Sequence, residues 1–453
     1  MLKIFDIFKD EKLKKSLFSI AVPVMLQNLI SYGITLMDTI MLGKLGEIEL
    51  SAAALANQYA TIYMVITFGI ASGTNIMLAQ YWGKGDVVSM RSIESITLRV
   101  STVISLVFFL LAFFLPQTIM SIFTPDILIR EAGVKYLKIV CFGYFMHGLT
   151  NVMLMTLRSI GNVKASMMVY GGTLVTNTFL NWVLIFGNLG APALGIEGAA
   201  IATVISHTLE FIVTVYYVLF REKKIAFRLH DIVFYDKSFY RDYLHTAVPV
   251  IFAELIWSLG NSVLTVIMGQ MGQGFVAANS IVSVVNQIAT VATVGLGNAA
   301  AVIVGNLIGA GDEEKAKDFS RSIIFMSLMA GTAAGIIMFL LRPLIIGGFN
   351  VREDTAALTM KLLTVSSVVL AFQSVNFVEI CGILRGGGDT RFALIIDTAF
   401  LWGFAIPLGF VAGLKFNLAP PIVYILLRSD EILKFFVGTS RIIKGKWVKN
   451  ITR

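Results

Sequence analysis

The pattern of apolar and polar positions divides the chain into long apolar segments joined by short polar ones. A membrane-spanning helix needs about 20 mostly apolar residues, and the chain offers twelve such segments. Segments of this length favour helices over the strands of a membrane barrel, which are about 10 residues long. The predicted spans are 16–42, 52–80, 94–115, 133–157, 165–188, 196–220, 243–268, 276–308, 320–341, 356–384, 391–412 and 418–437. The last span is the weakest, because the polar stretch "LLRSDEILK" interrupts it.

The composition agrees with this pattern. Of the 453 residues, 57% are hydrophobic and only 14% are charged, whereas soluble domains carry about 25% charged residues. The two cysteines, Cys141 and Cys381, both lie in apolar segments and indicate no disulfide framework. The first residues mix Lys with Asp and offer no cleavage site, so residues 1–15 predict an amphipathic cytoplasmic helix rather than a signal peptide. The chain is therefore expected to be a polytopic membrane protein.

Lysine and arginine positions set the predicted orientation. With a cytoplasmic N-terminus, 28 of the 36 basic residues fall on the cytoplasmic side of the twelve spans. The opposite side holds eight: Lys44, Arg130, Lys135, Lys138, Arg342, Arg352, Lys361 and Lys415. This bias follows the positive-inside rule and predicts a multi-pass protein of the plasma (inner) membrane with both termini cytoplasmic. The net charge of +8 reflects the same bias, so no nucleic-acid partner is expected.

The two halves of the chain resemble each other. The tetrapeptide "AVPV" at Ala21–Val24 returns at Ala247–Val250, 226 residues later. The same offset relates Gly43 to Gly269, Gly46 to Gly272, Gly69 to Gly295, Gly83 to Gly309, and Asp86 to Asp312. After one residue of slippage, "LRSIGN" matches "LRGGGD", which places Arg158 on Arg385.

This repeat predicts the domain organisation. A unit of six spans enters the membrane in the same direction in both copies, and such parallel repeats are typical of secondary transporters. We expect an N-lobe at 16–220, a cytoplasmic linker at 221–241, a C-lobe at 242–438 and a basic cytoplasmic tail at 439–453.

Several spans carry a polar face. In the first span the spacing of three to four residues places four polar side chains on one side of the helix. The faces comprise Asn28, Ser31, Thr35 and Asp38; Thr173, Asn177 and Asn181; Thr203, Ser206, His207 and Glu210; Glu254, Ser258, Asn261 and Thr265; and Asn279, Ser283, Asn286, Thr290 and Thr293. A single hydroxyl can simply join two helices, but a whole polar face with a carboxylate indicates a wetted cavity.

Five acidic residues fall within the predicted spans, and each is a functional hypothesis by default. Glu379 and Asp397 lie near Arg385 and Arg391 and could form ion pairs there; Glu210 could pair with His207 or Arg221; and Glu254 lies on the polar face of the seventh span. Asp38, which lies late in the first span, is the strongest candidate. At offset 226, Asp38 matches Leu264 and Glu254 matches Asn28, so neither acid is required by the repeated scaffold.

The sequence offers no motif for chemical catalysis. GxxxxGK[ST], HExxH and GxSxG are all absent. The four histidines, His147, His207, His230 and His245, are too scattered along the chain to predict a metal site. We therefore expect no enzyme and no cofactor. An intramembrane receptor is disfavoured as well, because the longest loop has about 20 residues.

These features together resemble the multidrug and toxic compound extrusion (MATE) transporters over essentially the whole chain. The resemblance rests on two six-span halves, "AVP" with "DTIMLGKLG" on the first span, a G-x-G-D pattern after the second and eighth spans, two "LR..G" turns, and "NTFLNWVLIFG" before "GAAIATVIS". It implies a V-shaped pair of lobes that opens alternately to each side. It also implies export of amphipathic organic cations against inward flow of H⁺ or Na⁺, in a protein that we expect to be a monomer.

The resemblance also assigns residues. The coupling-ion positions correspond to Asp38, Asn177, Asn181 and Thr203, although many relatives carry Asp where this chain has Asn181. A seventh-span acid of many relatives falls on Trp257, one turn beyond Glu254. The predicted substrate cavity comprises Gln27, Tyr32, Asn57, Glu254, Trp257, Asn261, Asn286 and Glu379. The alternative is a flippase or exporter of lipid-linked or other amphiphilic metabolites, which would need a cavity rich in Arg and Lys.

Overall fold

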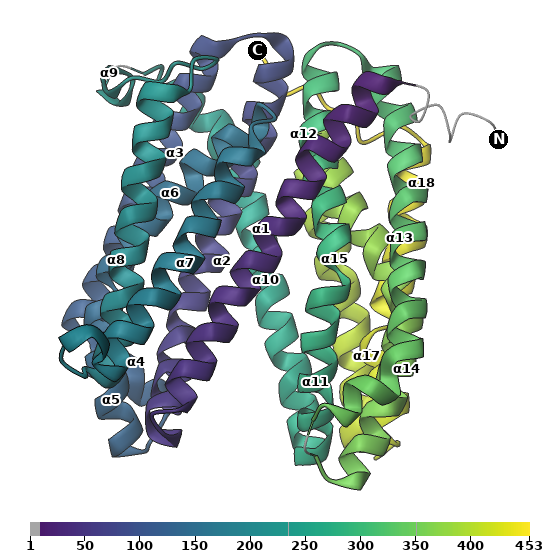
Figure 1. Ribbon diagram of the computed structural model, residues 1–453. Helices are drawn as coiled ribbons and strands as arrows, with labels where there is room; N and C mark the ends of the chain where they lie inside the picture. Colours follow the sequence, from purple (N-terminus) through teal and green to yellow (C-terminus); the bar gives the residue numbers. More distant parts are fainter. Residues whose placement is uncertain (1–9, 234, 350) are drawn as a thin grey trace. The chain divides into compact units, whose positions relative to one another are not determined.

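The computed structural model describes residues 10–233, 235–349 and 351–453, so most of the predicted N-terminal amphipathic helix (1–9) lies outside the described residues. The elements of the first half are α1 (Glu11–Gly43), α2 (Glu47–Lys84), α3 (Val87–Phe114), α4 (Pro116–Phe123), α5 (Ile127–Val140), α6 (Phe142–Ser159), α7 (Val163–Phe186), η2 (Asn188–Gly190), α8 (Gly195–Tyr216), η3 (Tyr217–Arg221) and α9 (Leu229–Val233). Those of the second half are α10 (Phe239–Met271), α11 (Gln273–Ala289), α12 (Val291–Gly309), α13 (Glu313–Gly347), α14 (Glu353–Phe377), η4 (Val378–Leu384), α15 (Thr390–Phe400), η5 (Leu401–Ala405), α16 (Ile406–Phe410), η6 (Val411–Lys415), α17 (Pro420–Leu427) and α18 (Asp430–Ile443). The predicted all-α architecture is confirmed (Figure 1).

The helices match the predicted spans, and the differences have local causes. Ten helices of the described residues are long and apolar enough to cross a membrane, and the pair α5 and α6, bent by 49°, supplies an eleventh. The segment that we ranked weakest consists of two short helices, α17 and α18, because Arg428 and Ser429 interrupt the helix there. The predicted span 276–308 is likewise divided at Thr290, between α11 and α12.

The chain forms two compact units that differ from the predicted lobes by an exchange of short segments. One unit contains Leu26–Leu78 and Asp86–Ile251; the other contains the chain up to Met25, Ala79–Gly85 and Phe252–Arg453. The predicted lobes at 16–220 and 242–438 divide the chain at the linker instead. The unit boundary in α1 follows Met25 and that in α10 follows Ile251, again 226 residues apart. Both copies of the repeat therefore exchange the first part of their first helix.

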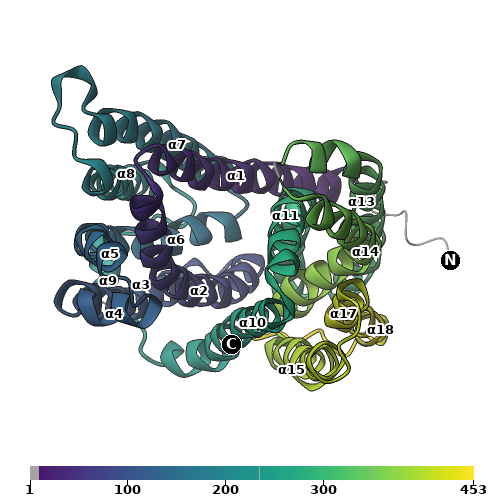
Figure 2. The ribbon, with the colours of Figure 1, turned by 90° about the horizontal axis from the view of Figure 1, so that it is seen from below.

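Within the first of these units, α6 and α7 pack against α8, and α3 packs against α6 (Figure 2). In the other unit, α13 and α11 pack against α14, and η4 packs against α12. Each unit has an apolar core of its own.

A close helix crossing in the second unit preserves the repeat. A Cβ atom at Gly83 would lie 2.0 Å from the carbonyl oxygen of Asn306, and one at Gly309 would lie 1.8 Å from that of Gln80. These two glycines, and the two residues that they contact, are each separated by the repeat offset of 226. Only glycine permits this backbone approach, so the sequence match between the two glycines has a packing cause.

The predicted basic tail is docked along most of its length. α18 continues to Ile443, and beyond it the Trp447 ring is completely buried. The amide of Lys449 donates to the carbonyl of Gly387 at 2.8 Å, and that of Ile451 donates to Oε1 of Gln80 at 2.9 Å. The tail is therefore part of the packed structure of its unit.

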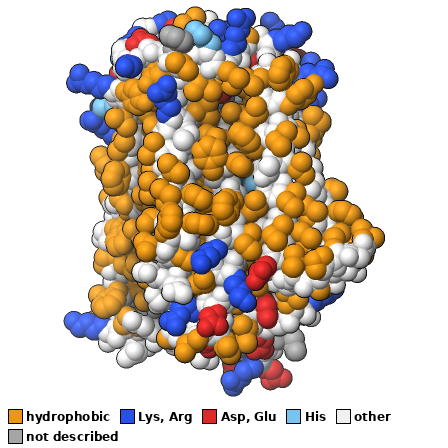
Figure 3. All heavy atoms as spheres, turned by 90° about the vertical axis from the view of Figure 1, so that its left-hand side faces the viewer, with side chains coloured by type: hydrophobic (Ala, Val, Ile, Leu, Met, Phe, Trp, Pro, Cys, Tyr) orange, Lys and Arg blue, Asp and Glu red, His pale blue; other side chains and the backbone are white. Residues whose placement is uncertain are grey.

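Apolar side chains dominate the surface between the helix ends. On the face shown in Figure 3 they form a broad belt, with lysine, arginine and acidic side chains gathered above and below it. Exposed apolar residues of α3 and α8 include Val103, Leu106, Leu110, Ile205, Leu209 and Ile212. Such a large exposed apolar area fits a helix bundle that lies in lipid.

Candidate functional site

Asp38 lies on α1 and contacts the polar face of α7. The side-chain amide of Asn181 donates to Oδ1 of Asp38 at 2.5 Å and to Oδ1 of Asn177 at 3.2 Å. Asn177 and Asn181 are buried and four residues apart, which places them on one side of α7. The structure thus brings together three of the four residues that the sequence assigned to the coupling ion.

The fourth residue, Thr203 of α8, joins the site through a tyrosine. Its hydroxyl donates to the carbonyl of Ala199 within its own helix at 3.0 Å. The Tyr136 side chain of α5 interacts with Thr203 and Asn57 and also, electrostatically, with Asp38. The sequence analysis missed Tyr136, because a tyrosine in an apolar helix gives no distinct signal.

Two histidines and an acid gather on α6 and α8 of the same unit. Nδ1 of His207 and Oε2 of Glu210 lie 3.2 Å apart, and the ring centroids of His147 and His207 are 4.8 Å apart. One ligating atom from each of the three residues lies within 4.8 Å of the others. We expected no metal site from histidines so scattered along the chain, yet two of the four lie side by side in the fold. Residues 60 positions apart meet because α6 approaches α8 closely at Gly143, where a Cβ atom would lie 3.1 Å from Cδ2 of His207.

Gln27, predicted to line the substrate cavity, is 9% exposed and engaged by an arginine. Nη2 of Arg158, at the end of α6, donates to Oε1 of Gln27 at 3.1 Å. Tyr170 of α7 interacts with Gln27, Arg158 and Glu210. Of the other predicted cavity residues in this unit, Tyr32 is half-buried and Asn57 is exposed.

The other unit carries ion pairs. Nη1 of Arg385 lies 2.6 Å from Oε1 of Glu254, and the arginine side chain is only 4% exposed. Glu379, which is completely buried, accepts a hydrogen bond of 2.6 Å from the Thr439 hydroxyl.

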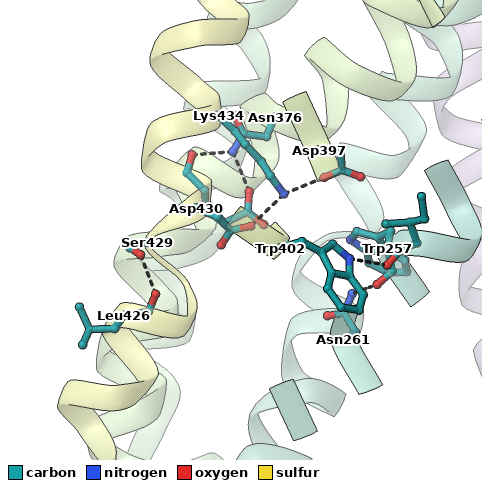
Figure 4. Close-up of polar contacts among 11 residues, drawn as sticks. Trp257, Asn261, Asn376, Asp397, Trp402, Leu426, Ser429, Asp430 and Lys434 are labelled. Carbon is teal, nitrogen blue, oxygen red and sulfur yellow. Dashed lines mark hydrogen bonds and ion pairs between the residues drawn. The ribbon is translucent and has the colours of Figure 1, made fainter. Parts of the chain in front are cut away.

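Asp397 has a different partner from the one that we expected. Its ion pair is with Lys434 of α18, at 2.7 Å, rather than with Arg385 or Arg391 (Figure 4). Lys434 also contacts Asp430 at 2.8 Å. The sequence analysis missed this buried lysine because "LLRSDEILK" was interpreted only as an interruption of a span.

The remaining predicted cavity residues make local contacts. Trp257 is 48% exposed, and its carbonyl accepts from the amide of Asn261 at 2.9 Å (Figure 4). Oδ1 of Asn286 accepts from the Ser366 hydroxyl at 3.0 Å. One further acid was missed: Glu94 on α3 is 1% exposed, although the predicted span begins at that residue and we did not count it among the intramembrane acids.

Comparisons with known proteins agree with the fold and the repeat. The curated relatives include the Thermotoga maritima protein named "Probable multidrug resistance protein NorM", 26% identical over 97% of this chain and 94% of the relative. A relative of the same name from Agrobacterium fabrum is 29% identical over 94% of this chain and 96% of the relative. "Multidrug resistance protein PmpM" from Pseudomonas aeruginosa is 24% identical over 88% of this chain and 84% of the relative.

Solved structures share the fold over almost the whole chain. A MATE transporter from Vibrio cholerae superposes with a TM-score of 0.88 at 16% identity, covering 96% of this chain and 98% of its own. A MOP superfamily transporter from Pyrococcus furiosus gives 0.86 at 19% identity, covering 96% of both chains.

The family comparison matches the repeat itself. The MatE family model matches twice, at residues 23–183 and 249–411, so each match begins at the proline of an "AVPV" sequence. Because these matches cover more than half of the chain, once in each repeat, the chain belongs to the MATE family of membrane transporters.

Proposed function

We propose that this protein is a secondary active multidrug efflux antiporter that exports amphipathic organic cations in exchange for inward H⁺ or Na⁺. The observation that carries the proposal is the environment of Asp38. Glu254 and Asp397 are neutralised by Arg385 and Lys434, whereas Asp38 is held by the neutral amide of Asn181. A carboxylate within a membrane span is costly unless a cation compensates its charge, and a coupling ion supplies that charge.

The neighbouring oxygens suit either ion. Oδ1 of Asn181 is buried and, among the described residues, has no hydrogen-bond partner. This oxygen belongs to the same side-chain amide whose nitrogen donates to Asp38. A proton on Asp38 would turn this carboxyl into a donor, while Na⁺, a hard cation, takes oxygen ligands. Binding of either ion removes the negative charge of Asp38, which favours release of a cationic drug from the same region.

The energetics are sufficient for export. Each unit of ΔpH supplies about 1.4 kcal/mol per proton, and each 100 mV adds about 2.3 kcal/mol per net charge moved. One or two ions therefore support roughly ten- to thousandfold accumulation ratios. Several relatives are named multidrug resistance proteins, which supports a drug as the exported molecule.

The test compares Asp38→Asn with the wild-type protein in dye efflux from energised vesicles. The Na⁺ and H⁺ gradients are collapsed separately, so that the loss of efflux identifies the ion. The matched control is Asp354→Asn, because the side chain of Asp354 is 95% exposed. We expect Asp38→Asn to lose gradient-driven efflux while folding normally and Asp354→Asn to keep it. Normal efflux by Asp38→Asn would sink the proposal.

A second candidate is the export or flipping of amphiphiles with an anionic head group. Three buried basic residues, Arg158, Arg385 and Lys434, give it a specific basis. Two of them already face carboxylates, which leaves less positive charge for such a ligand. Competition distinguishes the candidates: an anionic amphiphile that blocks dye efflux more strongly than a cationic one of equal chain length would favour this alternative.

We further propose that the protein functions as a monomer in the plasma membrane with both termini in the cytoplasm. The bias of basic residues supports this orientation. The test fuses a reporter domain that is active only in the cytoplasm to the N-terminus and, separately, to the C-terminus. Activity of both fusions is expected, and an inactive fusion would contradict the orientation of that terminus.

A further inference from the structure

We infer that His207 and Glu210, with the His147 ring packed against His207, form a proton relay that connects Asp38 with the Gln27–Arg158 pair, which makes H⁺ the coupling ion. The inference rests on the proposed function, because it assigns a route to the ion that Asp38 binds. All of its residues belong to one compact unit, 26–78 and 86–251.

Polar side chains on three helices follow the same direction through this unit. On α1 they extend from Gln27 to Asp38, and on α7 from Tyr170 to Asn181, eleven residues in each case. At 1.5 Å per residue, each series spans roughly 16 Å. On α8 the polar residues follow the spacing Thr203, His207 and Glu210, which places them on one side of that helix.

Interactions link the two ends of this series. Asp38 interacts electrostatically with His207, and His207 contacts Glu210 at 3.2 Å. Glu210 in turn interacts with Tyr170, which interacts with Gln27 and Arg158. Asp38, His207 and Glu210 can each give or accept a proton, and Tyr170, Gln27 and Arg158 lie at the other end of the series.

Two acceptor atoms at the centre of the series have no hydrogen-bond donor among the described residues. Among the described residues, Nδ1 of His147 and Oε1 of Glu210 are buried acceptors without a hydrogen-bond partner. A buried acceptor left unpaired is destabilising. A proton on this cluster satisfies one of these acceptors, and imidazole can accept a proton on one ring nitrogen while it donates from the other.

The cluster is less suited to Na⁺. It offers two imidazole rings and one carboxylate, whereas hard cations are bound through several oxygen atoms. Outside the cluster, the titratable groups that interact with it include Asp38 from α1 and Tyr170 from α7. Series of Asp, Glu and His within a membrane are typical of proton relays in transporters.

The proposed step moves one proton without any change of oxidation state. The carboxyl of Asp38 gives its proton to the His207 ring and becomes a carboxylate. The resulting imidazolium transfers the proton from Nδ1 to Oε2 of Glu210, which becomes a carboxylic acid. Glu210 then releases the proton to water on the side of Tyr170 and Gln27. The fixed positive charge of Arg158 disfavours a proton at that end, which promotes its release.

The experiment uses the purified full-length protein in liposomes. It measures dye transport driven by a pH gradient, the accompanying proton flux from a trapped pH indicator, and dye–dye exchange without any gradient. Exchange needs no net proton release, so it reports folding and substrate binding. The relay variants are His207→Gln and Glu210→Gln. The controls are His230→Gln, exposed on α9, and Glu197→Gln, whose side chain is 43% exposed.

We expect both relay variants to reduce gradient-driven transport and proton flux at least about tenfold, which corresponds to about 1.4 kcal/mol, while exchange stays within about twofold. Both controls should resemble the wild-type protein. Transport at the wild-type rate in His207→Gln and Glu210→Gln, loss of exchange together with transport, or transport driven by Na⁺ alone would each overturn the relay. Stoichiometric binding of Co²⁺ that requires His147, with transport unchanged in the relay variants, would identify a metal site instead. The proposed function is tested separately by Asp38→Asn, so it can stand even if the relay is overturned.

Discussion

The two repeats hold corresponding arginines in different ways. In the first repeat Arg158 donates to the neutral amide of Gln27; in the second, Arg385 forms an ion pair with Glu254. The partners are 131 residues apart in both cases, and the second pair lies 227 residues after the first. Glu254 aligns with Asn28 at the offset of 226, one position after Gln27, so the corresponding arginines contact adjacent positions of the first helix of their repeat. One of these contacts is to an amide and the other is to a carboxylate.

The difference extends beyond this contact. Tyr170 and Asp397 each stand twelve residues after their arginine; the first is uncharged in its ordinary form, and the second pairs with Lys434. Asp38 corresponds to Leu264, which is 3% exposed within an apolar core. In the second repeat Glu254 and Asp397 are compensated by fixed cationic partners, while the buried Glu379 accepts from the Thr439 hydroxyl. The first repeat instead keeps the proposed series of Asp38, His207 and Glu210. A duplicated scaffold has thus placed its proposed chemistry in one copy.

The largest expected effect comes from removing one acid of the second repeat. Glu254→Ala leaves the Arg385 charge buried without its carboxylate, and loss of one partner of a buried pair costs about 3–5 kcal/mol. Gln27→Ala removes an uncharged partner from Arg158 and should cost about 1–3 kcal/mol. Thermal unfolding in detergent should therefore give Glu254→Ala the lower Tm of the two.

A double variant controls for the loss of packing. Replacing both partners, as Glu254→Leu with Arg385→Met, removes the charge together with its counter-charge and should recover most of the lost stability. If Gln27→Ala unfolds at or below the Tm of Glu254→Ala, the contrast between a neutral and an ionic contact is wrong.

The helix crossing at Gly83 and Gly309, where the two repeats are alike, gives the next prediction. Gly83→Ala and Gly309→Ala each force a methyl group onto a carbonyl oxygen, at Asn306 and Gln80 respectively. Overpacking of this kind costs about 1–3 kcal/mol, and we expect the two variants to lose similar stability. Unequal losses, differing by more than about 1 kcal/mol in denaturation assays, would show that the crossing is not symmetric.

Two other helical glycines provide the control. Cβ atoms at Gly172 and Gly347 would meet no atom within 4 Å. Alanine at these positions should be neutral, or stabilising by up to about 1 kcal/mol, because alanine has the better helix propensity.

The fold could be predicted from the sequence because its signals are local. Span length and apolarity depend on neighbouring residues, and the repeat is visible as a constant offset. Partners in space depend on helix packing instead: Lys434 with Asp397, and His147 with His207, could not be inferred from spacing. The resemblance to the MATE family grouped Asp38, Asn177 and Asn181, which are in contact. Their role in ion binding stays a prediction.

Gln27→Glu converts the contact of the first repeat into that of the second. A carboxylate opposite Arg158 would form an ion pair like that of Glu254 with Arg385, so the protein should fold with little change in stability. The added carboxylate can bind the released proton and slow its departure. Gradient-driven transport should therefore fall about three- to fivefold, a change in activation free energy of less than about 1.4 kcal/mol. The reciprocal Glu254→Gln should leave proton flux per dye unchanged. Equal effects of both substitutions on proton flux in liposomes would contradict the division of roles between the repeats.

The smallest effect is expected where the polar faces of the two repeats are built in the same way. The hydroxyl of Thr35 on α1 donates to the carbonyl of Ser31, and that of Ser262 on α10 donates to the carbonyl of Ser258, four residues earlier in each case. These hydroxyls are exposed, and each donates its hydrogen bond within its own helix rather than to a second helix. Thr35→Val and Ser262→Ala should therefore change stability by no more than about 0.5 kcal/mol and leave gradient-driven transport within about twofold. A larger loss of transport in Thr35→Val alone, measured beside dye–dye exchange, would add this hydroxyl to the polar series between Gln27 and Asp38 and sharpen the contrast with the second repeat.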